Sequence, residues 1–284
     1  MGDAMADVER VKANIQLVRE LSNELAGHIH ALPEDIWRNA EQFGSPCEGW
    51  KVADVITHLV EGANLYSLSI ARALKGESSP PMGHRSMNHQ QATKALISLR
   101  ASYDEDLFLE FNGSCKQINT LLVSLESKDF ETPAFHPYFG AIPISRLIEF
   151  RVLELAVHGW DIRYSLDRSA TLSEKALPFL TGWMQNWFSF GFQKGDRLES
   201  PITYRFRLNE PVSESYDMVI KGNKFSLQPS DASDADVTFS CDTDTYILFG
   251  MGRLPFARSV RRGRLSFEGD EKLASQFTDW FGPV

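Results

Sequence analysis

The chain has 284 residues, of which 43% are hydrophobic and 24% charged, and this balance excludes an intrinsically disordered protein. Its formal net charge of −9 argues against a broad nucleic-acid-binding surface, which would need clustered lysines and arginines. No apolar run approaches the ~20 residues that cross a bilayer, so no membrane partner is expected either.

Three cysteines, at positions 47, 115 and 241, lie far apart without the short spacings of a metal ribbon or a redox motif. Such a sparse, odd set forms no disulfide framework and suits a reducing compartment. The first 16 residues are charged and lack the apolar segment of a secretory signal. We therefore expect a cytoplasmic protein, and the sequence indicates no protein partner.

The first 170 or so residues have the pattern of long amphipathic helices. Residues 8–32 place Val11, Ile15, Val18, Leu21 and Leu25 at helical spacing. Further helices are predicted over residues 51–76, over residues 88 to about 127 with an interruption near FNGS (111–114), and after a loop at 131–143. Four long helices joined by loops predict a four-helix bundle over residues 1–168.

The pattern changes after residue 168. An aromatic-rich helix is predicted over residues 171–192, followed by strand-like alternation. The predicted strands are 202–208, 215–221, 224–230, 235–241 and 263–269, with helices at 243–251 and 270–281. This order predicts a smaller α+β domain over residues 169–284, built on a mainly antiparallel sheet.

The stretch RVLELAVHGWDIR (151–163) carries four polar side chains at steps of three, four and three. Arg151, Glu154, His158 and Asp161 therefore share one narrow stripe of a helix. One interpretation is a solvated face laced by ion pairs. The other is a site that faces inward, because apolar residues cover most of the remaining helix surface and buried charge needs a partner or a metal.

A metal would suit this stripe. The side chains of Glu154 and His158 can reach one point, and carboxylate oxygen and imidazole nitrogen are good ligands for zinc. His58 offers a third ligand if the helix over 51–76 packs beside the stripe. Two histidines and one carboxylate leave coordination positions open, as in catalytic sites. Asp161 would then orient the imidazole of His158.

Two segments resemble a known family. SPCEGWKVADVITHLVEGANLY (45–66) resembles the PC-x-GW-x-V-x-D-x-x-x-HL segment of the mycothiol-dependent maleylpyruvate isomerase family. RVLELAVHGWDIRYSLD (151–167) resembles its later R-x-x-E-x-x-x-H-x-W-D segment. GRLSFEGDEKLASQF (263–277) is similar to the end of the sterol-carrier-like domain that closes many members.

The resemblance implies a DinB-like four-helix bundle that holds a divalent metal, usually zinc, through two histidines and a glutamate. By motif these match His58, His158 and Glu154. It also implies a low-molecular-weight thiol such as mycothiol, which a metal would deprotonate. The thiolate would add to a conjugated double bond; after rotation, elimination returns the thiol in an isomerase, whereas the thiol stays attached in a transferase. We expect one of these two activities on a small, acidic electrophile.

Arginines cluster just before the last predicted strand, at positions 258, 261, 262 and 264. The resemblance implies that basic residues of the C-terminal domain bind acidic groups of the substrate or thiol. Arginine suits this role because its planar guanidinium binds carboxylates bidentately. We expect it of Arg261 and Arg264, and the alternative is a solvated basic turn.

Two further residues are candidates for the site. Cys47 lies in the first motif and is expected to pack at the start of the second helix, because free cysteine often behaves as a small hydrophobe. His136 lies in the predicted loop at 131–143. It could line the mouth of a cleft, but a loop histidine is usually exposed.

Other functions use similar residues. Two histidines and a carboxylate also occur in non-haem iron oxygenases, and a metal-activated water would make a hydrolase. A third alternative is a non-catalytic carrier, in which the C-terminal domain holds an apolar ligand among the aromatic side chains of residues 183–192. A bound metal with thiol-dependent turnover would favour the thiol-using enzyme. Retained lipid without metal would favour the carrier.

Overall fold

The structure of the chain is a computed structural model that describes residues 2–31, 42–47, 49–84, 89–103, 106–193, 200–209, 213–231 and 234–281. It divides into two compact units, residues 1–176 and residues 177–284. The described part of the first unit is mainly helical, and the second combines helices with a sheet. This is the α+β fold class that the sequence predicts.

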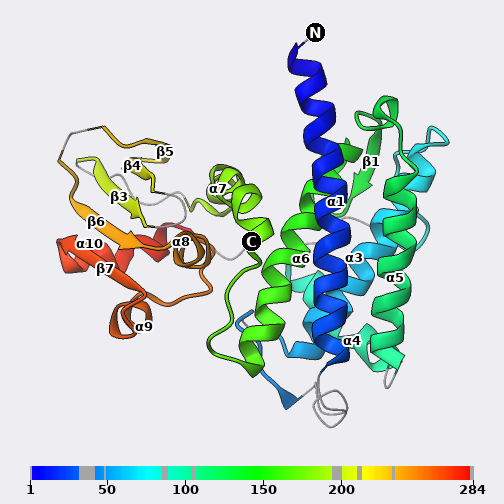
Figure 1. Cartoon of the computed structure of the whole chain (residues 1–284), viewed down its shortest axis with the longest axis horizontal. Helices are drawn as coiled ribbons and strands as arrows, with labels where there is room; N and C mark the ends of the chain where they lie inside the picture. The colour runs from blue at the N-terminus through cyan, green and yellow to red at the C-terminus, as the bar shows by residue number, and fades with distance from the viewer. Residues whose placement is uncertain are drawn as a thin grey trace. The chain divides into compact units, whose positions relative to one another are not determined.

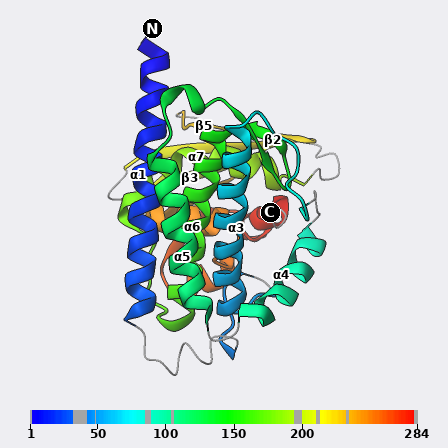
Figure 2. The same ribbon diagram turned by 90° about the vertical axis from the view of Figure 1, so that its right-hand side faces the viewer.

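Four long helices run side by side in the first unit (Figures 1 and 2). They are α1 (Gly2–His30), α3 (Val52–Ala73), α5 (Leu107–Val123) and α6 (Ile144–Leu166). The apolar stripe predicted for the first helix, from Val11 to Leu25, is buried against the other helices. The predicted four-helix bundle is therefore confirmed.

The helix predicted from Asn88 to Ser127 is two helices, α4 (His89–Tyr103) and α5. Asn88 itself lies outside the described residues. The prediction of a break at residues 111–114 is wrong, because these residues continue α5. Phe111 is buried there and accepts a hydrogen bond from the Ser114 hydroxyl on its carbonyl. None of the described helices combines the length and the apolar character needed to span a membrane.

Residues 133–143 form a β-hairpin where the sequence predicts a loop. Strand β1 (Pro133–His136) pairs with β2 (Gly140–Pro143), and His136 lies opposite Gly140. Gly140 has a φ of +70°, which a side chain would disfavour, so glycine allows the chain to turn here. Three successive side chains of β1, from Ala134 to His136, are buried. The strand therefore lacks the alternation by which sequence analysis finds strands.

The second unit contains a five-stranded sheet of order β5-β4-β3-β6-β7, antiparallel except between β3 and β6. Its strands are β3 (Ile202–Leu208), β4 (Ser215–Lys221), β5 (Lys224–Pro229), β6 (Val237–Cys241) and β7 (Leu265–Gly269). Its helices are α7 (Leu177–Gly191), α8 (Thr243–Gly250), α9 (Phe256–Arg261) and α10 (Glu271–Gln276). Short 3₁₀ turns in the described part of the chain include η3 (Ser127–Asp129), η4 (Glu174–Ala176) and η5 (Phe277–Trp280).

Aromatic rings fill the core of the second unit. The rings of Phe206, Phe239 and Phe277 lie 5.1–5.6 Å from one another, centroid to centroid. Trp183 and Phe188 of α7 are also buried. Large aromatic side chains dominate buried area, so these residues supply much of the apolar contact that holds the unit together.

Candidate functional site

The four polar side chains of the stretch 151–163 face the inside of the bundle. The side chains of Arg151 and Asp161 are fully buried, and those of Glu154 and His158 are only 15% and 13% exposed. A solvated helix face would keep such groups in water. The stripe is therefore an interior one, which places four polar side chains where each needs a partner.

Helix α3 packs against α6 and presents a second stripe to it. His58, Gly62 and Tyr66 follow one another at steps of four residues, so they lie on one face of α3. A Cβ atom at Gly62 would lie 2.9 Å from Glu154 Oε2, closer than real side chains approach. Glycine at this position gives the carboxylate of Glu154 the space it occupies.

The three candidate ligands meet between these two stripes. His58 Nε2 lies 4.0 Å from Glu154 Oε1, and the rings of His58 and His158 lie 4.9 Å apart in an edge-to-face arrangement. The structure thus brings together one side chain from α3 and two from α6, as the sequence predicts if the two helices pack side by side.

The donor atoms suit a divalent metal, although they are not yet at ligand distances. No group of three or more His, Cys, Asp or Glu side chains in the described part of the chain is arranged as a complete metal site. Two ligands of one tetrahedral zinc lie ~3.3 Å apart, slightly less than the 4.0 Å between His58 and Glu154. Two imidazoles and a carboxylate are also the donor set that zinc accepts. The donor set therefore fits a zinc-like metal by its chemistry.

Asp161 and Trp50 hold the imidazole of His158. Asp161 Oδ2 lies 2.9 Å from His158 Nδ1, and a carboxylate only accepts hydrogen bonds. The neutral ring therefore carries its proton on Nδ1 and keeps a lone pair on Nε2. Trp50 stacks on His158 with centroids 5.9 Å apart, and lies 5.2 Å from the ring of His58. The tryptophan of the GW motif thus packs against both histidines.

The two oxygens of Glu154 have different partners. The hydroxyl of Tyr66 donates to Oε1 at 2.8 Å, whereas Arg151 Nη1 donates to Oε2 at 3.3 Å. Burial raises the pKa of Tyr66 well above its usual value, and the negative charge of Glu154 raises it further. Tyr66 therefore keeps its hydroxyl proton and donates it to Oε1. The same oxygen, Oε1, is the one that faces His58.

Arg151 ties three helices together beneath the site. Its Nη1 also donates to the Leu59 carbonyl of α3 at 2.9 Å, and its Nη2 lies 3.7 Å from Cys115 Sγ of α5. The fully buried guanidinium of Arg151 pairs with the carboxylate of Glu154, which avoids the cost of an unpaired buried cation.

Asp54 and Glu61 lie on α3 near His58 in sequence but are paired elsewhere. Asp54 accepts from Arg100 of α4 at 2.9 Å and from the backbone N–H of Lys51 at 2.8 Å, which caps the start of α3. The hydroxyl of Tyr103 donates to Glu61. Both acidic side chains therefore bind residues of α4, and Asp54 also caps the first turn of α3.

His136 is buried and reaches the site through Tyr66, so the expectation of an exposed loop histidine is wrong. Its Nε2 lies 3.3 Å from the Tyr66 hydroxyl. The reason is the hairpin, which turns β1 inward against α3.

Cys47 is half-buried in the turn before α3, and its backbone carbonyl accepts a hydrogen bond from the Trp50 N–H. Tyr66 and Gly62 were missed, although their four-residue steps from His58 are visible in the sequence.

The two predicted arginines belong to the second unit. Arg264 forms an ion pair with Asp244 at the start of α8, and its Nε donates to Thr245 Oγ1 at 3.2 Å. Arg261 is exposed at the end of α9. The structure thus gives Arg264 an internal partner and leaves the side chain of Arg261 at the surface of its unit.

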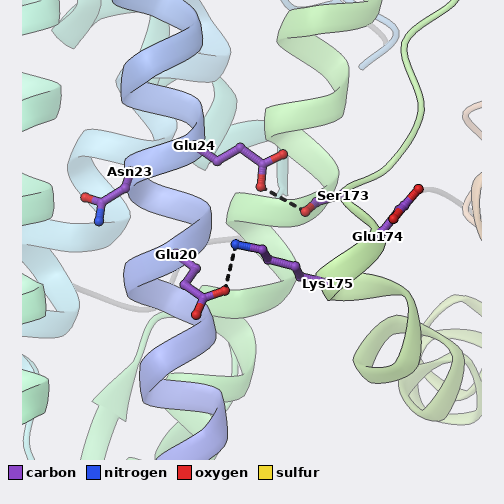
Figure 3. A pocket seen from close by; sticks show the side chains of 6 residues that line it. All are labelled: Glu20, Asn23, Glu24, Ser173, Glu174 and Lys175. Atoms are coloured by element: carbon purple, nitrogen blue, oxygen red, sulfur yellow. Dashed lines mark hydrogen bonds and ion pairs between the residues drawn. The ribbon is translucent and has the colours of Figure 1, made fainter.

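A pocket in the first unit lies between α1 and the segment that follows α6 (Figure 3). It is lined by Glu20, Asn23, Glu24, Ser173, Glu174 and Lys175. Lys175 points to Glu20, with 3.0 Å between Nζ and Oε2, and Ser173 donates to Glu24 at 2.9 Å. The pocket contains none of the residues of the two facing stripes, and these polar groups pair with one another.

Comparisons with known proteins agree with this architecture. Residues 18–163 match the family model of the mycothiol maleylpyruvate isomerase N-terminal domain, and residues 199–282 match that of the SCP-2 sterol transfer family. No curated protein sequence matches the chain at a significant level.

Two solved structures share the fold over most of the chain. One is a crystal structure of the mycothiol-dependent maleylpyruvate isomerase, with a TM-score of 0.61 and 18% identity over 86% of this chain and 90% of that one. The other is a histidine-to-alanine variant of that isomerase, with a TM-score of 0.63 and 16% identity over 91% and 92% of the two chains.

Proposed function

The chain belongs to the mycothiol maleylpyruvate isomerase N-terminal domain family, and from this membership we propose that it is a metal-dependent enzyme that uses a low-molecular-weight thiol. His58, Glu154 and His158 would hold the metal, with zinc the first candidate. The thiol would be mycothiol or a similar molecule, and the reaction an isomerisation or an S-conjugation of a small, acidic electrophile. The convergence of the three donors from α3 and α6 carries the proposal.

The surrounding residues would prepare this site for catalysis. A divalent metal, when bound, would lower the pKa of a thiol that binds beside it. Asp161 keeps the lone pair of His158 on Nε2, the nitrogen that a metal would use. Arg151 and Tyr66 fix the two oxygens of Glu154. Trp50 packs against both imidazole rings and would limit their movement.

Acidic groups of the substrate or thiol would bind to arginine in the second unit. Arg261 and Arg264 are the proposed residues. Arg264 already donates to Asp244 and Thr245, so Arg261 has more donors to offer a ligand. Its guanidinium can bind a carboxylate bidentately.

The carrier alternative draws on the match to the SCP-2 sterol transfer family. An apolar ligand would need space inside the second unit. The rings of Phe206, Phe239 and Phe277 contact one another in that interior and occupy it. Lipid that remains bound to purified protein would support the carrier, whereas a metal-dependent response to thiols would support the enzyme.

Cobalt(II) provides a test that reports on metal and thiol together. The protein is stripped of metal, loaded with cobalt(II) and titrated with mycothiol, cysteine or glutathione. A thiol that binds the metal produces a thiolate-to-cobalt charge-transfer band in the near ultraviolet. We expect this band in the wild type and not in His58→Ala, with His30→Ala, an exposed histidine of α1, as the matched control.

Two other results would point to a different function or a different metal site. Cobalt binding without a thiol band would favour a hydrolase or an oxygenase that uses the same three ligands. Equal bands in the wild type and His58→Ala would place the metal elsewhere in the protein.

A further inference from the structure

A hydrogen-bonded chain leads from the β-hairpin to Glu154. The backbone N–H groups of Tyr138 and Phe139, in the turn of the hairpin, donate to His136 Nδ1 at 3.1 and 3.3 Å. His136 Nε2 lies 3.3 Å from the hydroxyl of Tyr66, and that hydroxyl lies 2.8 Å from Glu154 Oε1. Three elements, the hairpin, α3 and α6, are joined by this chain.

The direction of the chain is fixed. His136 Nδ1 receives two backbone donors, so it carries no proton and the ring proton lies on Nε2. His136 therefore donates to Tyr66. The hydroxyl of Tyr66 in turn donates to Glu154 Oε1. Every hydrogen bond in the chain points toward Oε1.

Burial protects this arrangement. The side chains of His136 and Tyr66 are both buried. Burial lowers the pKa of His136 to about 4, which keeps the ring neutral with one donor and one acceptor. Water has little access to replace either partner, so Glu154 depends on this chain for the hydrogen bond to Oε1.

Arg151 is the reason why Glu154 needs such a partner. Its guanidinium already donates to Oε2, and arginine prefers to bind both oxygens of a carboxylate. Without a donor at Oε1, the carboxylate would be free to turn toward Arg151. The Tyr66 hydroxyl opposes this rotation and leaves Oε1 facing His58.

We propose that Tyr66 and His136 are positioning residues that hold Glu154 Oε1 in place for the metal, and this inference rests on the proposed function. His136 acts through Tyr66, and the hairpin turn acts through His136. Partners of a metal ligand of this kind typically contribute about 10–100-fold to metal affinity.

The first test measures zinc affinity of metal-free protein by competition with a chelating dye. Tyr66→Phe removes only the hydroxyl, and we expect the affinity to fall by about 10–100-fold. Tyr103→Phe is the matched control, because Tyr103 also donates to a glutamate, Glu61, from an adjacent helix. The control should bind zinc like the wild type. Circular dichroism and thermal unfolding establish that both variants are folded.

The second test separates positioning from a structural role of His136. Glutamine can place an amide N–H near the position of Nε2, and asparagine can place a carbonyl near Nδ1. His136→Gln should therefore keep more of the zinc affinity than His136→Asn, which serves only the hairpin turn. The double variant Tyr66→Phe/His136→Asn should lose no more affinity than Tyr66→Phe alone, because His136 acts through Tyr66.

Other outcomes would each contradict one step: the role of Tyr66, the role of His136 or the metal site itself. If Tyr66→Phe binds zinc like the wild type, the positioning role is wrong and the proposed metal site stands. If His136→Asn keeps affinity and His136→Gln loses it, the role of His136 is structural. If the folded wild type binds no zinc, the proposed function fails, and the positioning role fails with it.

Discussion

At the scale of single residues, Gly62 of α3 leaves room for the carboxylate of Glu154 from α6. A glycine inside a helix normally lowers stability by about 0.5–1 kcal/mol relative to alanine. Here the missing side chain makes room for Glu154, because a methyl group would lie 2.9 Å from Oε2. The local cost of glycine is offset by the close approach of a charged group from the neighbouring helix.

Gly62→Ala should therefore lower the free energy of unfolding or displace Glu154, instead of stabilising the helix. We expect zinc affinity to fall, with stability unchanged or about 1 kcal/mol lower. Urea denaturation and zinc titration measure the two effects. Gly113→Ala in α5 is the matched control, because the added methyl group would meet no atom within 4 Å beyond its chain neighbours and the backbone of its own helix. It should stabilise the protein by about 0.5–1 kcal/mol; equal gains in both variants would contradict the role given to Gly62.

At the scale of elements, the β-hairpin makes the protein sensitive to acid. The pKa of His136 falls from 6.5 to about 4 on folding, because the ring is buried. The unfolded chain thus binds a proton more readily than the folded one. The stability that this histidine contributes is present above pH 6.5 and is lost as the pH falls toward 4, by roughly 3 kcal/mol in all.

The test compares unfolding free energies of the wild type and His136→Gln from pH 7 to pH 4. Glutamine does not titrate in this range, so the variant should lose about 3 kcal/mol less than the wild type over the interval. Parallel stability curves for the two proteins would show that His136 is not kept neutral by burial.

In the second unit, Arg264 and Arg261 have different environments. Arg264 neutralises Asp244, whose side chain is only 10% exposed. Arg264→Ala should lower the free energy of unfolding by about 1–3 kcal/mol, because it removes the cation that pairs with a buried carboxylate. Arg261→Ala should change it by less than about 0.5 kcal/mol. Thermal unfolding measures both, and equal effects would contradict the distinction.

Elements whose side chains follow a regular spacing along the chain can be predicted from the sequence. The helical spacing in α1, α3 and α6 is long enough to identify each helix and the stripe of Glu154 and His158. The β-hairpin is too short to show alternation, so its strands and the burial of His136 could not be predicted. The spacing of His58, Gly62 and Tyr66 was visible, but which face of α3 meets α6 is decided by tertiary packing.

At the scale of the whole molecule, the candidate metal site belongs to the first unit alone. His58, Glu154 and His158 all lie within residues 18–163, the segment that matches the family model. The fold class and the two-part organisation follow from the change in pattern after residue 168. The substrate could not be predicted, because it depends on side chains that meet only in the folded protein and that follow no period.

The metal content of the purified protein shows whether His58, Glu154 and His158 hold a metal. The purified protein and the variants His58→Ala, Glu154→Gln and His158→Ala are loaded with zinc, desalted and measured by elemental analysis, with His30→Ala as the control. We predict about one zinc per chain in the wild type and the control, and loss of zinc in all three variants. A wild type that retains no metal, or variants that retain it fully, would contradict a metal site between α3 and α6.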